Sequence, residues 1–464
     1  MTATESPEKQ PLDTSAYTAL EPLANDLLKH WNVPGVAVGI LRDGQVETWG
    51  FGLANIETQQ AMTADHLLQI GSISKVFTTT LVMLLVDEGK IDLDEPVRTY
   101  LPDLELKDAD ALATITMRHL VTHTSGLFGD FFEDFGVGDD ALSKAIAQYG
   151  TLRQITSPGE IWSYCNSGFN LAGAIIEKIL DMPFEQAMQE KVFAPLGLDH
   201  SFFFAAQAIV YPVAVGHVET EPGSGKIEVA RAYQLPRAVN PAGGIIATVA
   251  DLLGFAKFHI NNGMVDDEQI LSEESVRAMQ EIQTSAANFA QSWGLGWDIN
   301  DLDGVRVVGH GGSTNGFQAR LSVVPSKGYA IAILTDGDDG WAVNSALNEW
   351  ALREHCGLTD EKPAPVDLTP VHIANMAGTY ESQMAVLTLS PDNGSLRIDA
   401  RTKVNPLSPE ERELPPSWVW PISDYECIST TGPTAGTRTD FIADDNGRTR
   451  FIRLGGRVYD RVDD

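Results

Sequence analysis

The sequence predicts an α+β fold, in which a large domain with one antiparallel sheet and many helices precedes a small all-β domain. At 464 residues the chain is longer than one hydrophobic core usually grows, which favours two domains. Strand-like runs stand at both ends of a predominantly helical middle, which predicts one sheet built from distant segments. Short strand-like runs without helices follow, and these are typical of a small sandwich or closed barrel.

The first expected elements are a helix and a β-hairpin. Apolar residues recur at helical spacing between Leu20 and Trp31, and Pro34 ends this pattern. Residues 35–52 then read as two strands, because the Asp43-Gly44 pair between them is a strong hairpin signal. An antiparallel sheet is therefore expected to begin early in the chain.

The next expected element is a buried helix within residues 69–89. Gly71 gives a tight entry, Gly89 fits a helix stop, and the residues between are apolar on nearly every side. A helix that is apolar all round is buried. If the helix starts at or near Ser72, Lys75 lies on the same face one turn later, within reach of the serine hydroxyl.

The middle of the chain combines a long loop with further helices. Residues 128–140 are rich in Phe, Asp and Gly, and loops of this length are usually functional or disordered. Four phenylalanines make a pocket wall the favoured interpretation, and these are Phe128, Phe131, Phe132 and Phe135. A turn at Pro158-Gly159 leads to a helix from about Gly168, and another helix is expected to be capped near Thr248.

The predicted domain boundaries follow changes in composition. Residues 1–14 form a polar tail, residues 15–358 the large domain, and residues 359–368 a proline-rich, charged linker. Within the large domain, residues 305–335 supply further strands and a helix follows at about 343–354. Residues 369–464 contain eight short runs separated mostly by turn signals such as Asp392-Asn393-Gly394, Asp445-Asn446-Gly447 and Gly455-Gly456.

Composition restricts the partners. With 64 Asp and Glu against 32 Lys and Arg, the net charge of -32 argues against nucleic acid or an anionic membrane surface. Three widely spaced cysteines fit reduced thiols and give no metal-ligand pattern. The first residues show neither a basic opening nor an apolar core, so a cytoplasmic protein is expected. We expect a small-molecule partner and no cofactor, and the oligomeric state stays open.

Three motifs carry candidate chemistry. A buried lysine such as Lys75 needs a partner or a lowered pKa, and with a lowered pKa it can take a proton from Ser72. Tyr164 could share that proton transfer, and the Asn166 amide could hold a substrate carbonyl. The glycines of His310-Gly311-Gly312-Ser313 allow close approach of substrate to backbone. Taken singly, each motif also fits a capping serine, a buried tyrosine or a glycine turn, and a second S-x-x-K occurs at Ser6 to Lys9.

Taken together and in this order, the motifs resemble the serine β-lactamase and penicillin-binding-protein superfamily. More narrowly, residues 20–358 resemble the branch of class C β-lactamases, β-lactamase-type esterases and D-aminopeptidases, and the C-terminal part resembles a lipocalin-like barrel. The resemblance implies an α/β/α domain with a central antiparallel sheet and a helical subdomain.

The resemblance also implies roles for single residues. Ser72 would be the nucleophile, with Lys75 and Tyr164 as the acid and base pair. Asn166 would contact substrate, as would the segment of His310, Gly312 and Ser313. The backbone N–H groups of Ser72 and Ser313 would form the oxyanion hole, in which one donor is worth about 3 kcal/mol.

One departure from the pattern bears on the substrate. His310 stands where β-lactamases carry a lysine that helps bind a carboxylate, and a histidine is mostly neutral at pH 7. A serine hydrolase of small esters is therefore the leading hypothesis, with a D-amino-acid peptidase or amidase second. An acyltransferase, a weak β-lactamase and a non-catalytic sensor stay open. Acidic residues of the loop, Asp130, Glu133 and Asp134, could attract an amine, although a solvated loop face is the simpler interpretation.

Other motifs fail as sites. His119 and His123 lie four residues apart but lack the glutamate of H-E-x-x-H, so structural roles are favoured. The GSGK sequence at residues 223–226 lacks the earlier glycine of a phosphate loop. No G-x-S-x-G elbow is present, which disfavours the ordinary α/β-hydrolase fold.

Overall fold

The structure is a computed structural model that describes most of the chain. The described residues are 15–221, 223–287, 289–361, 363–404, 410–429, 436–444 and 447–462. The predicted polar tail, with its second S-x-x-K, and the Asp445-Asn446 part of a predicted turn lie outside the described residues.

An eight-stranded antiparallel sheet forms the centre of the large domain. Its strands, in spatial order, are β11 (Ser292–Trp293), β12 (Asp298–Leu302), β13 (Val305–Thr314), β14 (Phe317–Val324), β15 (Tyr329–Thr335), β1 (Gly35–Arg42), β2 (Gln45–Asn55) and β3 (Gln60–Ala61). The pairing of β1 with β15 joins the two ends of the domain, so the sheet combines distant segments as predicted.

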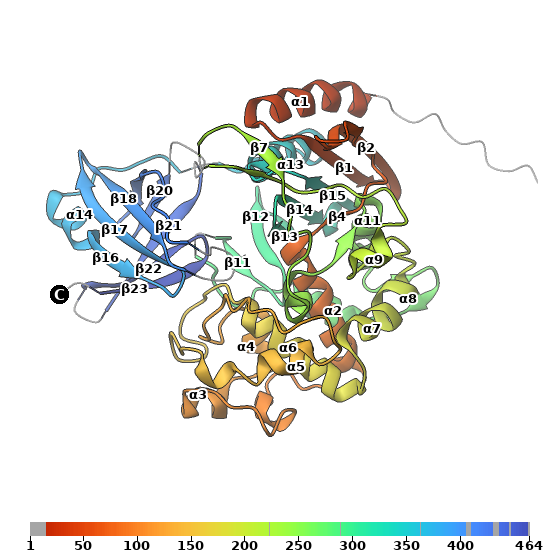
Figure 1. Cartoon of the computed structure of the whole chain (residues 1–464), viewed down its shortest axis with the longest axis horizontal. Helices are drawn as coiled ribbons and strands as arrows, with labels where there is room; N and C mark the ends of the chain where they lie inside the picture. Colours follow the sequence, from red (N-terminus) through yellow and green to blue (C-terminus); the bar gives the residue numbers. More distant parts are fainter. Residues whose placement is uncertain are drawn as a thin grey trace, which may run out of the picture.

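Helices cover both faces of this sheet (Figure 1). On one face α1 (Ser15–Trp31) packs with α13 (Gly340–Cys356) over a core that includes Val38, Ile331 and Leu347. On the other face α11 (Val249–Ile260) packs against β1 and β15, and the larger hydrophobic core lies on this side. The domain therefore has the layered α/β/α arrangement that the resemblance implies.

Most other helices form a subdomain beside the sheet (Figure 1). They are α3 (Ala109–Thr114), α4 (Met117–Val121), α5 (Ala141–Ile146), α6 (Asn166–Leu180), α7 (Phe184–Met188), α8 (Ala194–Leu196), α9 (Ala205–Ala208), α10 (Asn240–Gly243) and α12 (Glu273–Gln280). Short strands accompany them: β4 (Leu68–Gln69), β5 (Ser201–Phe202), β6 (His217–Glu219), β7 (Ile227–Val229), β8 (Ile246–Ala247), β9 (Met264–Val265) and β10 (Glu268–Gln269). Among the described residues, no helix is long and apolar enough to cross a membrane.

The buried helix predicted to start at or near Ser72 is α2 (Ser74–Asp87). A single 3-10 turn, η1 (Gly71–Ile73), leads into it, and Gly71 adopts a φ of 50° that favours glycine. Its side chains from Ser74 to Leu85 are buried, which confirms the expectation drawn from its apolar faces. Ser72 thus lies at the positive N-terminal end of a buried helix.

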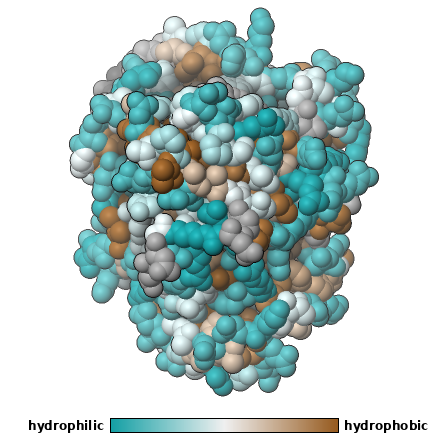
Figure 2. Space-filling model, turned by 90° about the vertical axis from the view of Figure 1, so that its left-hand side faces the viewer, coloured by the Kyte–Doolittle hydropathy of each residue, from teal (hydrophilic) through white to brown (hydrophobic). Residues whose placement is uncertain are grey.

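The C-terminal part is a closed antiparallel barrel of eight strands. Each of the eight predicted runs is a strand: β16 (Gly378–Glu381), β17 (Ala385–Asp392), β18 (Ser395–Thr402), β19 (Ser417–Ser423), β20 (Glu426–Ser429), β21 (Arg438–Ala443), β22 (Thr449–Leu454) and β23 (Arg457–Arg461). The helix α14 (Pro370–Met376) precedes them and contributes Ile373 and Met376 to the barrel core. In Figure 2 hydrophilic side chains dominate the barrel side of the molecule, and apolar ones are scattered.

Candidate active site

Ser72 and Lys75 lie within hydrogen-bonding distance at the start of α2. The Lys75 ammonium donates to Ser72 Oγ over 3.0 Å and to the Ala242 carbonyl over 2.6 Å. Lys75 is fully buried, at 0% exposure. Burial holds its pKa well below the usual value, and the positive charge of Arg457 lowers the pKa further. A lysine in this state is suited to accept a proton from the serine hydroxyl.

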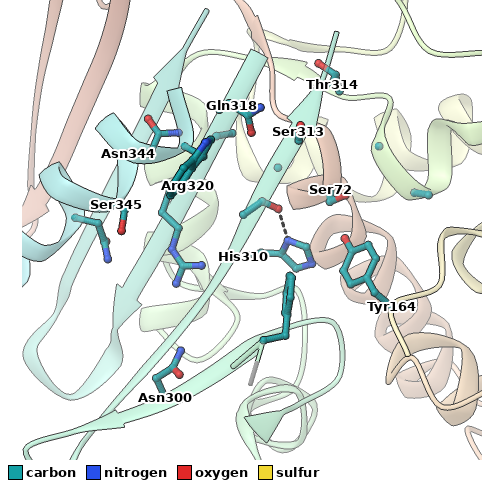
Figure 3. A pocket seen from close by; sticks show the side chains of 18 of the residues that line it. Ser72, Tyr164, Asn300, His310, Ser313, Thr314, Gln318, Arg320, Asn344 and Ser345 are labelled. Carbon is teal, nitrogen blue, oxygen red and sulfur yellow. Dashed lines mark hydrogen bonds between the residues drawn. The ribbon is translucent and has the colours of Figure 1, made fainter. Parts of the chain in front are cut away.

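Tyr164 comes from the connection just before α6 and completes a group of three polar side chains. Lys75 Nζ lies 4.9 Å from the centre of the tyrosine ring, and Tyr164 and Ser72 line the same cavity. Burial raises the pKa of the phenol above its ordinary value, so the hydroxyl keeps its proton and can donate it. Figure 3 shows Ser72, Tyr164 and His310 on the same side of β13.

The glycines of β13 allow this strand to approach η1 closely. A Cβ atom on Gly312 would lie 1.9 Å from the Ile70 carbonyl oxygen and 3.1 Å from the Ser72 nitrogen. A Cβ atom on Gly71 would lie 2.7 Å from the Ser313 nitrogen. The backbones that carry the predicted oxyanion-hole donors, Ser72 and Ser313, are therefore in direct contact, and both residues line the same cavity.

His310 is a buried, neutral member of the site. Its Nδ1 lies 2.5 Å from the Gly311 carbonyl oxygen, the contact dashed in Figure 3, so this nitrogen carries the proton and donates. Burial lowers the pKa of His310 to about 4. The ring therefore supplies no positive charge at neutral pH, as expected from the sequence.

A positive charge reaches the cavity from the barrel instead. Arg457, at the start of β23, forms a two-pronged ion pair with Asp130 at N···O distances of 3.2 and 3.1 Å. Asn166 Nδ2 donates to the same carboxylate over 2.8 Å. The residue predicted to contact substrate is thus hydrogen-bonded to this ion pair. Sequence reasoning missed Arg457, and the only signal near it was the predicted turn at Gly455-Gly456. Nothing in the spacing indicated that this turn faces Ser72.

The cavity in front of Ser72 has a volume of about 910 Å³. Phe132, Phe289 and Met384 are among the apolar residues that line it, and Met384 again belongs to the barrel. Of the four loop phenylalanines predicted to form a pocket wall, only Phe132 lines this cavity. Phe128 belongs to the hydrophobic core and Phe131 packs against Phe135, so the loop contributes one ring to the wall.

The two histidines of the rejected metal motif lie apart from the cavity lining. His119 Nδ1 accepts a hydrogen bond from the Thr116 backbone nitrogen and closes the N-terminal cap of α4. His123 lies behind Tyr164 and accepts from the backbone of Cys165. Across the described residues, no group of three or more His, Cys, Asp or Glu side chains is arranged to hold a metal ion.

An antiparallel sheet between helical layers, with a serine, a buried lysine and a tyrosine beside its strand β13, is the arrangement of a serine hydrolase. Comparison with known families agrees: the family model described as Beta-lactamase matches residues 20–353. The chain belongs to the beta-lactamase family.

Curated relatives support this assignment. Penicillin-binding protein 4 of Amycolatopsis lactamdurans is 34% identical over 359 residues, which cover 76% of this chain and 94% of the relative. A beta-lactamase of Pseudomonas fluorescens is 26% identical over 361 residues, 70% of this chain and 94% of the relative.

Solved structures show the same fold. The structure of SurE with D-Leu superimposes with a TM-score of 0.75 at 24% identity and covers 97% of this chain and 100% of SurE. A D-amino acid amidase from Ochrobactrum anthropi SV3, complexed with L-phenylalanine amide, gives a TM-score of 0.60 at 23% identity and covers 72% of this chain and 96% of the amidase. The larger coverage of SurE extends the similarity over the barrel.

Proposed function

We propose that this protein hydrolyses small esters and amides through an acyl-enzyme on Ser72. The observation that carries this proposal is the position of Lys75, whose side chain is fully buried with Nζ 3.0 Å from the serine hydroxyl oxygen. Neither of its two hydrogen-bond partners, a hydroxyl and a carbonyl, is negatively charged. The neutral amine is therefore the favoured form, and a neutral amine can act as a base.

The proposed reaction has two half-reactions. Ser72 Oγ attacks the substrate carbonyl while its proton passes to Lys75, and the resulting oxyanion lies against the N–H groups of Ser72 and Ser313. Tyr164 protonates the leaving group as the scissile bond breaks and regains a proton from Lys75, which leaves Ser72 acylated and both proton carriers in their starting forms. Water then attacks the acyl group through the same proton carriers, releases the acid and restores the serine. Ester leaving groups need the least help from the acid, so esters are the favoured substrates.

A D-amino-acid amidase or peptidase is the second candidate. Asp130 and Arg457 both line the cavity, and together they offer a carboxylate to an amine and a guanidinium to a carboxylate. An amino acid derivative carries one or both of these charges. The names of two structural neighbours, a D-amino acid amidase and SurE with bound D-Leu, support this candidate.

Hydrolysis of β-lactams is a weaker candidate. His310 is neutral, and the guanidinium of Arg457 is already paired with Asp130 through two contacts. An anionic β-lactam would have to compete with Asp130 for Arg457, and Arg320, which also lines the cavity, is paired with Asp298 at 2.7 and 3.2 Å. We therefore expect slow turnover of β-lactams.

A substrate panel tests these candidates. The panel contains p-nitrophenyl acetate, the D and L enantiomers of phenylalanine amide, and a chromogenic cephalosporin, each assayed with the wild type and with Ser72→Ala. We expect sustained turnover of the ester that the substitution abolishes. Faster cleavage of the D than of the L amide, at rates near that of the ester, would favour the second candidate. A single burst without turnover would instead indicate a sensor that acylates once, and unchanged activity in Ser72→Ala would refute the site.

A further inference from the structure

The backbone around Tyr164 is held in an unusual way. Tyr164 lies in residues 162–165, which belong to no helix or strand. Nevertheless, three successive backbone N–H groups there have hydrogen-bond acceptors from distant parts of the chain. Ser163 N donates to the His123 carbonyl over 2.9 Å, Tyr164 N to the Gly456 carbonyl over 2.8 Å, and Cys165 N to His123 Nδ1 over 2.9 Å.

His123 holds this segment from the side of the helical subdomain. Its carbonyl and its ring bond the residues on either side of Tyr164, and its ring stacks on the tyrosine ring with centres 4.2 Å apart and planes 29° apart. His123 is fully buried and has a φ of 60°, a backbone conformation that is costly for a side chain of this size. Strain of this kind persists only where the surrounding contacts compensate for it.

The acceptor role of His123 requires a neutral ring. Nδ1 accepts from Cys165 N, so it carries no proton, and the single proton of the neutral ring lies on Nε2. Burial keeps the pKa of His123 well below its usual value. The acceptor is thus available throughout the neutral pH range.

Gly456 holds Tyr164 from the side of the barrel. It lies in the turn between β22 and β23, next to Arg457, and has a φ of 76°. A Cβ atom there would lie 3.0 Å from Phe289 Cδ2 and 3.3 Å from Tyr164 Cβ. The neighbouring Gly455 has a φ of 56°, but no atom lies within 4 Å of its Cβ position. A side chain would therefore meet neighbouring atoms at Gly456, which contacts Tyr164, but not at Gly455.

We propose that His123 and the Gly456 carbonyl are positioning groups that set the place of Tyr164 against Ser72 and Lys75. The barrel thereby takes part in catalysis through a backbone contact, in addition to lining the cavity. This inference rests on the proposed function, because it assumes that Tyr164 transfers protons during acylation. We call the contacts of His123 and the Gly456 carbonyl to the Tyr164 segment the clamp. Displacement of a reacting group by about 1 Å costs up to about 100-fold in rate, so loss of these contacts should lower kcat measurably.

The first arm of the test compares two adjacent glycines. Gly456→Ala and Gly455→Ala both pay for an alanine at positive φ, about 1 kcal/mol, but only Gly456→Ala pushes on Tyr164. With p-nitrophenyl acetate we expect Gly456→Ala to lower kcat by about 10- to 100-fold while KM changes less than about threefold. Gly455→Ala should stay within about threefold of wild type in both constants, since nothing meets its methyl group.

The second arm compares two replacements of His123 that are similar to each other in shape. Asparagine keeps an acceptor near the place of Nδ1 and tolerates a positive φ, whereas leucine has the same branched shape as asparagine and no acceptor. We expect His123→Asn to recover at least about a third of wild-type kcat and His123→Leu to fall about 10-fold or more. His259→Leu is the control for loss of a buried histidine, because His259 contacts Thr80 on α2 and no residue of the clamp.

Two further readouts separate the outcomes. Thermal unfolding shows whether each variant is folded, and a fluorophosphonate that labels the nucleophilic serine reports acylation without the natural substrate. The inference is overturned if Gly456→Ala matches Gly455→Ala and His123→Leu matches His123→Asn. If Gly456→Ala does not fold, the His123 pair decides alone. If the wild type neither turns over ester nor reacts with the phosphonate, the proposed function fails instead.

Discussion

At the scale of single residues, the chemistry depends on the protonation state of Lys75. The side chain is buried with a hydroxyl and a carbonyl as its hydrogen-bond partners, and Asp130 acts on it only as a charge at a distance. Burial favours the uncharged form because an ion loses its hydration there. A lysine in this position therefore serves as a base, a role that solvent-exposed lysines cannot fill at neutral pH.

This state predicts a pH profile. Lys75 must be unprotonated to act, so kcat/KM should rise with pH through the lowered pKa of Lys75 and level off above it, well below pH 10. Lys75→Met and Lys75→Arg should each lose about 100- to 10,000-fold in kcat/KM, since neither side chain can take the proton. Initial rates from pH 5 to 10, with thermal unfolding as a folding control, check this. An Arg variant within tenfold of wild type would show that Lys75 is not the base.

The residues of the site differ in how far the sequence could predict them. Ser72 and Lys75 were predictable because three residues make one helical turn, so local geometry brings them together. Tyr164 and His310 could be predicted only from the order of the motifs along the chain, since the fold brings them close to Ser72. Arg457 was not predictable, because its place follows from how the barrel docks on the large domain.

At the scale of elements, the contact of β13 with η1 brings together the two backbones that we propose as the oxyanion hole. Two adjacent glycines of β13 have different surroundings: a Cβ on Gly312 would overlap the Ile70 carbonyl, and a Cβ on Gly311 would have the Ala319 oxygen at 3.8 Å as its nearest neighbour. Neither glycine has a positive φ, so backbone strain does not distinguish them. A comparison of substitutions at these two glycines therefore reports the effect of the distance between β13 and η1.

We predict that Gly312→Ala lowers kcat by about 100-fold or more, because it forces β13 and the Ser313 N–H away from Ser72, and one such donor is worth about 100- to 1,000-fold. Gly311→Ala should cost less than about tenfold in kcat, since its methyl group enters open space. Steady-state kinetics of both variants with p-nitrophenyl acetate measure the difference. Equal losses would argue against this placement of the oxyanion hole.

Element boundaries show where sequence reasoning was less accurate. The eight barrel strands were predicted because turn signals separate most of the short β-prone runs. The start of α2 at Ser74 agrees with the prediction of a start at or near Ser72, but the sequence did not reveal the 3-10 turn that carries Ser72. Three of the four loop phenylalanines were misplaced as pocket wall, since composition cannot tell a ring that faces a cavity from one that packs in the core.

At the scale of the whole molecule, several buried polar contacts join the barrel to the hydrolase domain, and Arg453 makes one of them. Arg453 on β22 pairs with Asp440 at 3.0 and 2.8 Å and donates to the Trp162 carbonyl at 2.7 Å. Trp162 lies two residues before Tyr164, so this contact and the Gly456 contact fix neighbouring positions. The two domains are joined where the candidate active site is built.

Substitution of two arginines of the barrel tests how much this contact contributes to the free energy of unfolding. Arg453→Met leaves Asp440 buried without its partner and should lower the free energy of unfolding by about 3–5 kcal/mol. Arg450 reaches Glu160 across the same interface at 3.4 Å but is half-exposed, so Arg450→Met should cost about 0–1 kcal/mol. Urea unfolding of both variants measures the contrast. Similar small losses in both would show that the buried contact does not hold the domains together.

The most direct test of the whole account is the identification of the acylated residue. Wild-type protein is mixed with p-nitrophenyl acetate, quenched in acid during turnover and analysed by peptide mass spectrometry. The account predicts one acetyl group, carried by the peptide that contains Ser72 and absent from Ser72→Ala. Turnover of the ester with the acetyl group on another residue, or with no acyl-enzyme and full activity in Ser72→Ala, would contradict it.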